Sequence, residues 1–101
     1  MNIKINKVKA SPMGFGYWVS GKYTGEWKDE YTFHVKMFDA PSEEYGMDET
    51  RVSKLTVKKN GVVVLNFDRG YDGDRYEMDE EDRIGLLVYL DNLPSYDKLA
   101  A

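Results

Sequence analysis

The spacing of apolar residues changes once along this chain, after Phe67, and this change constrains the fold more than any other feature. In most of the strand patterns before that point apolar residues recur at every second position, which is the spacing of a half-buried β-strand. From about Asp79 to Asn92 they recur at helical spacing, at Ile84, Leu87, Val88 and Leu93, with Met78 and Tyr89 nearby. Strands followed by one final helix predict an α+β domain, with a four- to five-stranded antiparallel sheet and one C-terminal helix packed on one face.

The strand patterns are clearest in the middle of the chain. Residues 31–37 alternate apolar and polar side chains, which predicts a strand with one buried and one solvated face. Asn60-Gly61 stands between the strand patterns 51–59 and 62–67, and we expect a hairpin there because a type I′ turn requires positive φ at both central residues. Further strands are expected at residues 2–8 and 15–23, and a long exposed loop from Asp39 to Thr50.

Length and composition indicate one small domain. The chain has 101 residues and no cysteine, which excludes disulfides, thiolate zinc sites and cysteine nucleophiles. We expect residues 1–94 to form a single α+β domain and residues 95–101 to form a flexible C-terminal tail. No stretch reaches the ~18 consecutive apolar residues that a membrane span requires, and the alternating N-terminal residues do not resemble a signal peptide. These features predict a cytoplasmic protein.

Acidic residues are concentrated in the last third of the chain. Residues 1–67 hold ten Lys/Arg and eight Asp/Glu, whereas residues 68–101 hold four and ten. The net charge of −4 argues against direct nucleic-acid binding, since phosphate affinity comes chiefly from Lys and Arg. The dense carboxylates of residues 68–82 are suited to a partner protein with a basic surface.

Three segments of the chain together form a distinctive set of motifs. They are Pro41-Ser42-Glu43-Glu44-Tyr45-Gly46-Met47, Arg51-Val52-Ser53-Lys54-Leu55 and Phe67-Asp68-Arg69-Gly70-Tyr71-Asp72. They resemble a small family of uncharacterised bacterial and phage proteins that carries Pro-Ser-x-Tyr-Gly-Ile, Arg-Val-Ser-Lys-Leu and Tyr-Asp-Arg-Gly-Trp-Asp motifs. This chain departs from that pattern by an extra residue in the first motif and by Met47, Phe67 and Tyr71 in place of Ile, Tyr and Trp. The resemblance spans about residues 15–72 and implies a bacterial or phage origin, with no assigned activity.

Candidates for catalysis or metal binding are few. The segment from Asp68 to Asp79 partly matches a calcium loop, but Gly stands at its third position and the shorter Asp at its twelfth. His34 is the only histidine, and no serine stands in a Gly-x-Ser-x-Gly elbow. We therefore expect no enzymatic activity, no catalytic residue, no metal site and no cofactor.

Two arginines are candidates for bracing the loop at residues 39–50. Arg51 or Arg69 is expected to reach back to Glu43 or Glu44. Exposed ion pairs of this kind contribute under about 1 kcal/mol each, so the expected role is structural.

Aromatic residues offer two hypotheses for a binding surface. Trp18 and Trp27 are expected to be exposed, and tryptophan is a favoured anchor of protein interfaces. Alternatively, a sheet face that presents Trp18, Lys22, His34 and Lys36 can stack single-stranded bases.

The sequence favours a non-enzymatic protein-binding module of bacterial or phage origin. In its most concrete form it is an acidic inhibitor of a host nucleic-acid enzyme or defence system, comparable to an anti-CRISPR protein. The alternatives are a structural or accessory protein that forms a homo-oligomer through a sheet edge or aromatic face, and a small-ligand or calcium binder. The residues expected to contact the partner are Asp72, Asp74, Glu77, Glu80, Glu81, Trp18 and Trp27.

Overall fold

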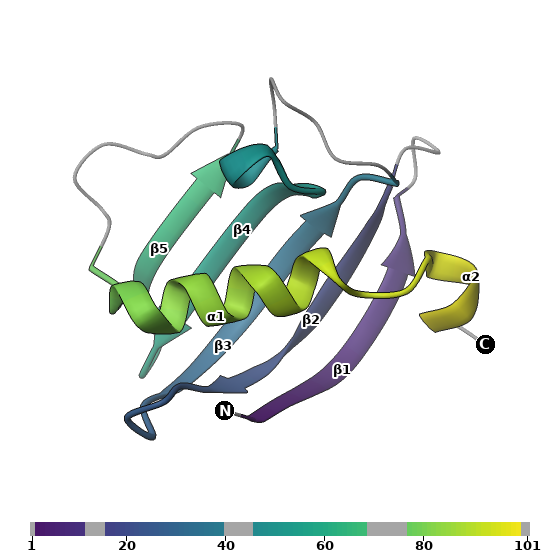
Figure 1. Ribbon diagram of the computed structural model, residues 1–101. Coiled ribbons are helices and arrows are strands. Elements are labelled where there is room, and N and C mark those ends of the chain that lie inside the picture. The colour runs from purple at the N-terminus through teal and green to yellow at the C-terminus, as the bar shows by residue number, and fades with distance from the viewer. Residues whose placement is uncertain (1, 12–15, 40–45, 69–76, 100–101) are drawn as a thin grey trace.

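The computed structural model describes residues 2–11, 16–39, 46–68 and 77–99 of the chain. Five antiparallel strands lie side by side in the order of the sequence (Figure 1). They are β1 (Asn2–Ala10), β2 (Tyr17–Thr24), β3 (Glu30–Met37), β4 (Val52–Lys59) and β5 (Val62–Asp68). The helix α1 (Glu80–Asp91) crosses one face of this sheet, which confirms the predicted α+β architecture.

The period-2 pattern of the sequence separates the two faces of the sheet. On β2 and β3 the positions predicted to face the core are buried, namely Tyr17, Val19, Tyr23, Tyr31, Phe33, Val35 and Met37. The same face continues through Leu55 and Val57 of β4 to Leu65 and Phe67 of β5. Because these residues pair across neighbouring strands, they form one continuous apolar layer beneath α1.

The turn between β4 and β5 has the predicted chemistry. Asn60 and Gly61 have φ of 52° and 79°, so both central residues lie in the left-handed region. Type I′ hairpins require this conformation, which Asn and Gly adopt more readily than other residues. The predicted hairpin is confirmed.

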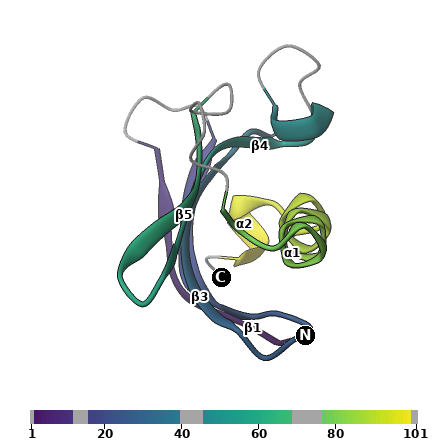
Figure 2. The same cartoon turned by 90° about the vertical axis from the view of Figure 1, so that its left-hand side faces the viewer.

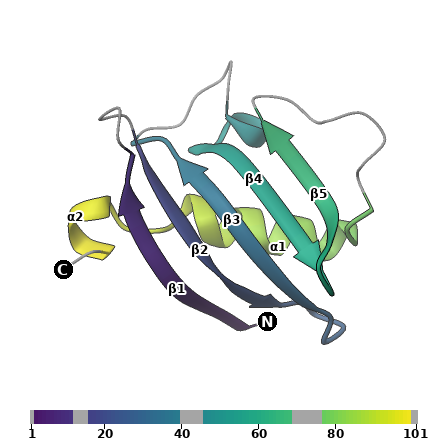
Figure 3. The same ribbon diagram turned by 180° about the vertical axis from the view of Figure 1, so that it is seen from behind.

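The sheet is curved, and its two faces have different surroundings. Figure 2 shows it bending around α1, so that the helix lies on the concave side. Seen from behind in Figure 3, the five strands lie in front of α1 and no described element covers them. We call this uncovered side the outer face.

The start of α1 agrees with the sequence, but its buried side agrees only in part. Asp79 is the N-cap, and its carboxylate accepts a hydrogen bond of 3.0 Å from the backbone N–H of Asp82. The predicted apolar positions Ile84 and Val88 are wrong as core residues, because they are 46% and 55% exposed. Leu87 is buried as predicted, as are Met78 and Leu93, and within the helix the buried stripe is Asp82, Leu86, Leu87 and Leu90. Because Asp82 is one of the buried residues, the apolar residues of α1 alone do not show which side of the helix faces the core.

Asp82 is buried because it joins α1 to the connection between β2 and β3. Its carboxylate accepts hydrogen bonds from the Tyr31 hydroxyl at 2.7 Å and from the Glu26 backbone N–H at 3.0 Å. Gly25 passes so close that a Cβ there would lie 2.3 Å from an Asp82 oxygen. These contacts satisfy a buried charge and secure the first turn of the helix.

Arg51 secures the other end of α1. Its guanidinium donates to the backbone carbonyl of Asp91 at 2.9 Å and to that of Leu93, and its backbone N–H donates to the Asp91 carboxylate at 3.0 Å. Arg51 thus satisfies carbonyl groups that a helix C-terminus leaves without partners. The predicted contact of Arg51 or Arg69 with Glu43 or Glu44 lies outside the described residues, as do Glu43, Glu44 and Arg69 themselves.

Two short helical segments lie where the sequence predicts an exposed loop and a flexible tail. Met47–Glu49 form one 3₁₀ turn, η1, and Met47 is fully buried. Tyr96–Leu99 form α2, in which Tyr96 and Leu99 pack against the core. Among the described residues, no helix is long and apolar enough to cross a membrane.

Candidate functional site on the outer face of the sheet

Three cross-strand rows of side chains form most of the outer face, and a fourth, of Asn2, Thr24 and Glu30, lies at one end of it. The pairing of the strands sets these rows, because partners in neighbouring strands point to the same side of a sheet. The first row is Lys9, Trp18, Lys36, Lys54 and Asp68; the second is Lys7, Ser20, His34, Thr56 and Asn66; the third is Lys4, Lys22, Thr32 and Lys58.

An irregularity in β1 places its lysines on one face. The pairing passes from Ile5–Gly21 directly to Lys7–Ser20, so Asn6 is an extra residue with no partner. In a regular strand Lys4 and Lys7 would point to opposite sides of the sheet, because side chains alternate at every residue. The bulge at Asn6 shifts the alternation by one residue, so that Lys4 and Lys7 point to the same side of the sheet. The sequence pattern alone does not reveal it.

The centre of the outer face is an aromatic pair. The rings of Trp18 and His34 are stacked, with centroids 4.5 Å apart and an interplanar angle of 13°. The Ser20 hydroxyl lies 2.6 Å from Nδ1 of His34 and so fixes the orientation of the imidazole. The Lys36 ammonium lies 6.0 Å from the centre of the Trp18 ring, within range of a cation–π interaction.

Charge on this face is strongly unbalanced. Within the described strands, the three rows contain seven lysines, whereas the carboxylates on this side are Asp68 and Glu30, one at the β5 edge and one at the end of β3. Asp68 forms an ion pair of 3.6 Å with Lys54. In the part of the chain that the structure describes, Lys4, Lys7, Lys9, Lys22 and Lys58 form no ion pair. Burial, together with the charge of Lys7, lowers the pKa of His34.

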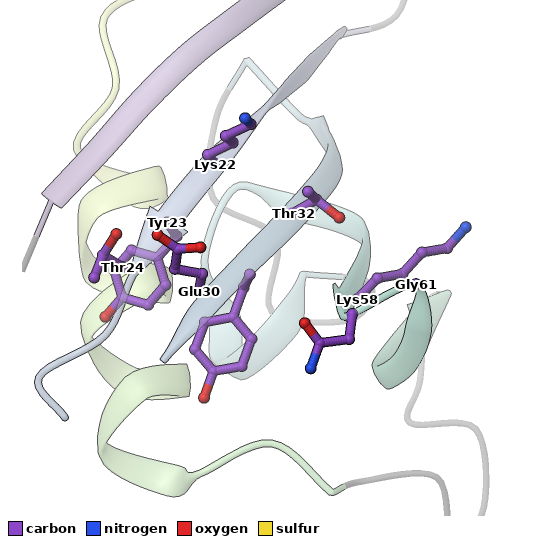
Figure 4. Close-up of a pocket in the computed structure, with 9 residues that line it drawn as sticks. Lys22, Tyr23, Thr24, Glu30, Thr32, Lys58 and Gly61 are labelled. Carbon is purple, nitrogen blue, oxygen red and sulfur yellow. The ribbon is translucent and has the colours of Figure 1, made fainter. Parts of the chain in front are cut away.

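Two hollows interrupt the outer face. One, of about 350 Å³, is lined by Lys7, Lys9, Trp18, Ser20 and His34. The other, of about 310 Å³, lies nearer the β4–β5 turn (Figure 4). It is lined by Lys22, Thr24, Glu30, Thr32 and Lys58, together with Tyr23, Tyr31, Asn60 and Gly61. Both combine lysine side chains with hydroxyl groups, which suits a ligand with anionic groups.

The acidic residues gather on the opposite side of the molecule, at the start of α1. Glu77, Glu80 and Glu81 are exposed there. A hydrogen bond with Glu26, and the charge of that group, raise the pKa of Glu81. The backbone N–H of Glu26 is hydrogen-bonded to Asp82 at the start of α1, so the next residue, Trp27, also lies near this acidic end. Trp27 is 69% exposed. Of the residues predicted to contact a partner, Trp27 therefore lies at the acidic end, and Trp18 lies apart on the outer face.

Part of the predicted site is outside the described residues. This holds for Asp72 and Asp74, and for most of the segment that partly matches a calcium loop. Among the residues that are described, no group of three or more His, Asp or Glu side chains is placed to hold a metal ion.

Sequence reasoning found part of the outer face and missed the rest. The alternation in β2 and β3 predicts that Trp18, Lys22, His34 and Lys36 share a face. It does not join them to Lys4, Lys7 and Lys9, or to Lys54 and Lys58. The signal that links them is the order of the strands, since consecutive antiparallel strands usually lie side by side.

Comparisons with known proteins place the chain in a family without assigning it an activity. No curated protein and no solved structure matches it. One family, described as a domain of unknown function, matches residues 17–87, which include β2 to β5 and the first two turns of α1. Since this match covers more than half of the chain, the protein belongs to the DUF7678 family.

Proposed function

We propose that this protein is a non-enzymatic binding module that takes single-stranded nucleic acid on the outer face of its sheet. The observation that supports this most is the stacked Trp18–His34 pair at the centre of seven lysines on an uncovered surface. Single-strand binders combine a positively charged surface for the backbone with aromatic rings on which bases stack. The net charge of −4 obscures this arrangement, because it averages the outer face with the acidic end.

The cross-strand positions of the lysines also support the proposal of a polyanionic ligand. Lys4 lies directly opposite Lys22, and Lys36 lies directly opposite Lys54. Like charges in directly opposed positions destabilise a sheet. An external polyanion would neutralise this repulsion, so the arrangement is unfavourable for the free protein and favourable for the complex.

The shape of the face favours a single strand over a duplex. Trp18 and His34 stand on a sheet, and the bases of a duplex are stacked on one another within the helix. A base reaches the aromatic pair only when it is unpaired and splayed outward, as in single-stranded recognition. A duplex would be left with phosphate contacts alone.

The test is a fluorescence anisotropy titration with labelled oligothymidylate of about 12 nucleotides. We expect the protein to bind this strand more tightly than a duplex of the same length. Trp18→Ala should weaken binding roughly 5- to 150-fold, because stacking of a base contributes about 1–3 kcal/mol.

Trp27→Ala is the matched control for this titration. It removes the other, more exposed tryptophan from the acidic end and should leave the affinity unchanged. No binding by the unmodified protein at about 50 mM salt would contradict the proposal, since electrostatic binding is favoured at low salt. Equal losses in the two variants would also contradict it.

A second candidate function uses the acidic end. Trp27 is the most exposed large apolar side chain of the described residues, and it adjoins Glu26, which interacts with Glu81. An exposed tryptophan among carboxylates is suited to a partner protein with a basic surface. On this alternative the protein is an inhibitor of a host nucleic-acid enzyme or defence system, as the sequence suggests.

A further inference from the structure

We infer that the hollow around Thr32 is a subsite for a backbone phosphate of the bound strand and that Glu30, at its rim, limits the affinity. The inference rests on the proposed function and adds where the backbone of the ligand lies. It also separates two contributions to binding, base stacking at Trp18 and phosphate binding at Thr32.

The first support is the placement of two cations around a hydroxyl. Thr32 lies directly opposite Lys22 of β2 and Lys58 of β4. Figure 4 shows Thr32 between these two lysines, which come from the strands on either side of β3. Strands are about 4.8 Å apart, so the two lysine stems are separated by about 10 Å. Flexible ammonium groups at this separation can converge on one phosphate above the threonine hydroxyl, which is itself a donor.

The second support is that neither cation has a competing partner in the described structure. Lys22 and Lys58 are exposed and form no ion pair among the described residues. Lys59, the next residue along β4, does form one, of 3.0 Å with Asp29. The two lysines that line the hollow are thus available for an external anion, whereas their neighbour is not.

The distance between the two hollows indicates that they bind different nucleotides of the same strand. Trp18 and Lys22 lie four residues apart on the same face of β2, a separation of about 13 Å. A single nucleotide does not span this distance, so the stacked base and the bound phosphate belong to different nucleotides. The ligand therefore extends along β2 and β3, and a mononucleotide engages only one of the two hollows at a time.

Glu30 is the feature that makes this inference testable by a gain of binding. It begins β3, is exposed, and lines the same hollow as Lys22 and Lys58. Its carboxylate repels a phosphate placed there. We expect Glu30→Gln to bind the oligonucleotide about two- to fivefold more tightly, the range for one exposed charge interaction. Loss of structure cannot produce such a gain. Glu80→Gln, at the acidic end, is the matched control and should have a smaller effect.

The salt dependence of binding tests the two lysines. For single strands the slope of log affinity against log salt is about −0.7 per phosphate contact. Because both lysines are assigned to one phosphate, the double variant Lys22→Gln/Lys58→Gln should reduce the magnitude of the slope by roughly 0.7. The control, Lys28→Gln/Lys98→Gln, removes two exposed lysines outside the outer face and should leave the slope unchanged. Trp18→Ala should lower the affinity at every salt concentration without changing the slope, because stacking releases no counterions.

The outcomes separate this inference from the function on which it rests. If the unmodified protein binds no oligonucleotide, the proposed function fails and the subsite fails with it. If the protein binds and Trp18→Ala weakens binding, but Glu30→Gln and the double lysine variant match their controls, the phosphate subsite alone is wrong. Tighter binding by Glu30→Gln together with a reduced slope for the double lysine variant supports it. Inorganic phosphate should compete only weakly, because it occupies one hollow and gains nothing from stacking.

Discussion

At the scale of a single residue, His34 links binding to pH. Burial and the nearby Lys7 lower its pKa, so the imidazole is neutral at pH 7. Other groups around it are Trp18 and Ser20 on β2, Lys36 on β3 and Thr56 on β4, and none of these carries negative charge. A bound polyanion would supply that charge and favour the protonated ring. We therefore expect the affinity for single-stranded nucleic acid to rise as the pH falls below about 6.5.

The variant His34→Gln provides the control for this prediction. It keeps a polar side chain beside Ser20 but cannot be protonated, so its affinity should change little over the same pH range. A titration at several pH values checks this, and an unchanged pH dependence in the variant would assign the effect to another group. For the stability of the free protein, a fall in pH has the opposite effect to the one expected for binding. Because the folded pKa of His34 lies below the unfolded value of about 6.5, its protonation lowers stability as the pH falls through that window.

At the scale of elements, α1 depends on one polar contact at each end. Arg51 binds backbone carbonyls at its C-terminus, and Asp82 joins its first turn to the β2–β3 connection. The apolar residues between them, Leu86 and Leu90, belong to the core, and apolar contacts of this kind are not directional. The polar contacts supply this position.

Tyr31→Phe should therefore destabilise the fold by about 1.5–3 kcal/mol. The change removes the hydroxyl that donates 2.7 Å to the buried Asp82 carboxylate, and hydrogen bonds to charged groups contribute about this amount. Chemical denaturation, followed by circular dichroism, measures the free energy of unfolding. Tyr89→Phe, which removes a hydroxyl from an exposed position on α1, should change it by less than about 0.5 kcal/mol. Equal effects in the two variants would show that the Asp82 contact does not stabilise the helix.

The same elements show what the sequence could predict. The strands, their faces and the Asn60–Gly61 hairpin follow from local rules, namely period-2 alternation and positive φ. The buried side of α1 was predicted correctly at Leu87 but not at Ile84 and Val88, because Asp82 interrupts the apolar stripe and an acidic residue in the first turn is ordinarily assigned to solvent. Its burial depends on Tyr31 and the Glu26 backbone, which are distant in sequence. Local patterns carry no information about such partners.

At the scale of the whole molecule, charge is segregated between two sides. Lysines occupy the outer face of the sheet, and exposed carboxylates gather on the helix side near Glu26 and Glu81. Such an arrangement orients an approaching polyanion, which is attracted to one side and repelled by the other. Sequence composition shows the concentration of acid near the C-terminus, but not that β1 to β4 gather the lysines on a single surface. Strand order and the bulge at Asn6 produce that result.

This segregation distinguishes the two candidate functions. The fourfold variant Asp72→Asn, Asp74→Asn, Glu80→Gln and Glu81→Gln removes negative charge from the acidic segment and changes none of the residues in the three rows of the outer face. If the outer face binds nucleic acid, the fourfold variant should bind oligothymidylate at least as tightly as the unmodified protein. Any gain should shrink as salt rises, because salt screens exposed charges.

The same variant in a pull-down from bacterial lysate tests the second candidate. A basic protein that the unmodified chain retains at low salt, and the folded variant does not, would show that the acidic end binds a partner. Retention that is equal for both chains would contradict that role. If instead the folded variant loses its affinity for oligothymidylate, the acidic end must contribute to the nucleic-acid site, and the separation of the two sides would be wrong. Each side carries its own tryptophan. Trp18→Ala should therefore weaken only the binding of oligothymidylate, and Trp27→Ala only the binding of a basic partner protein.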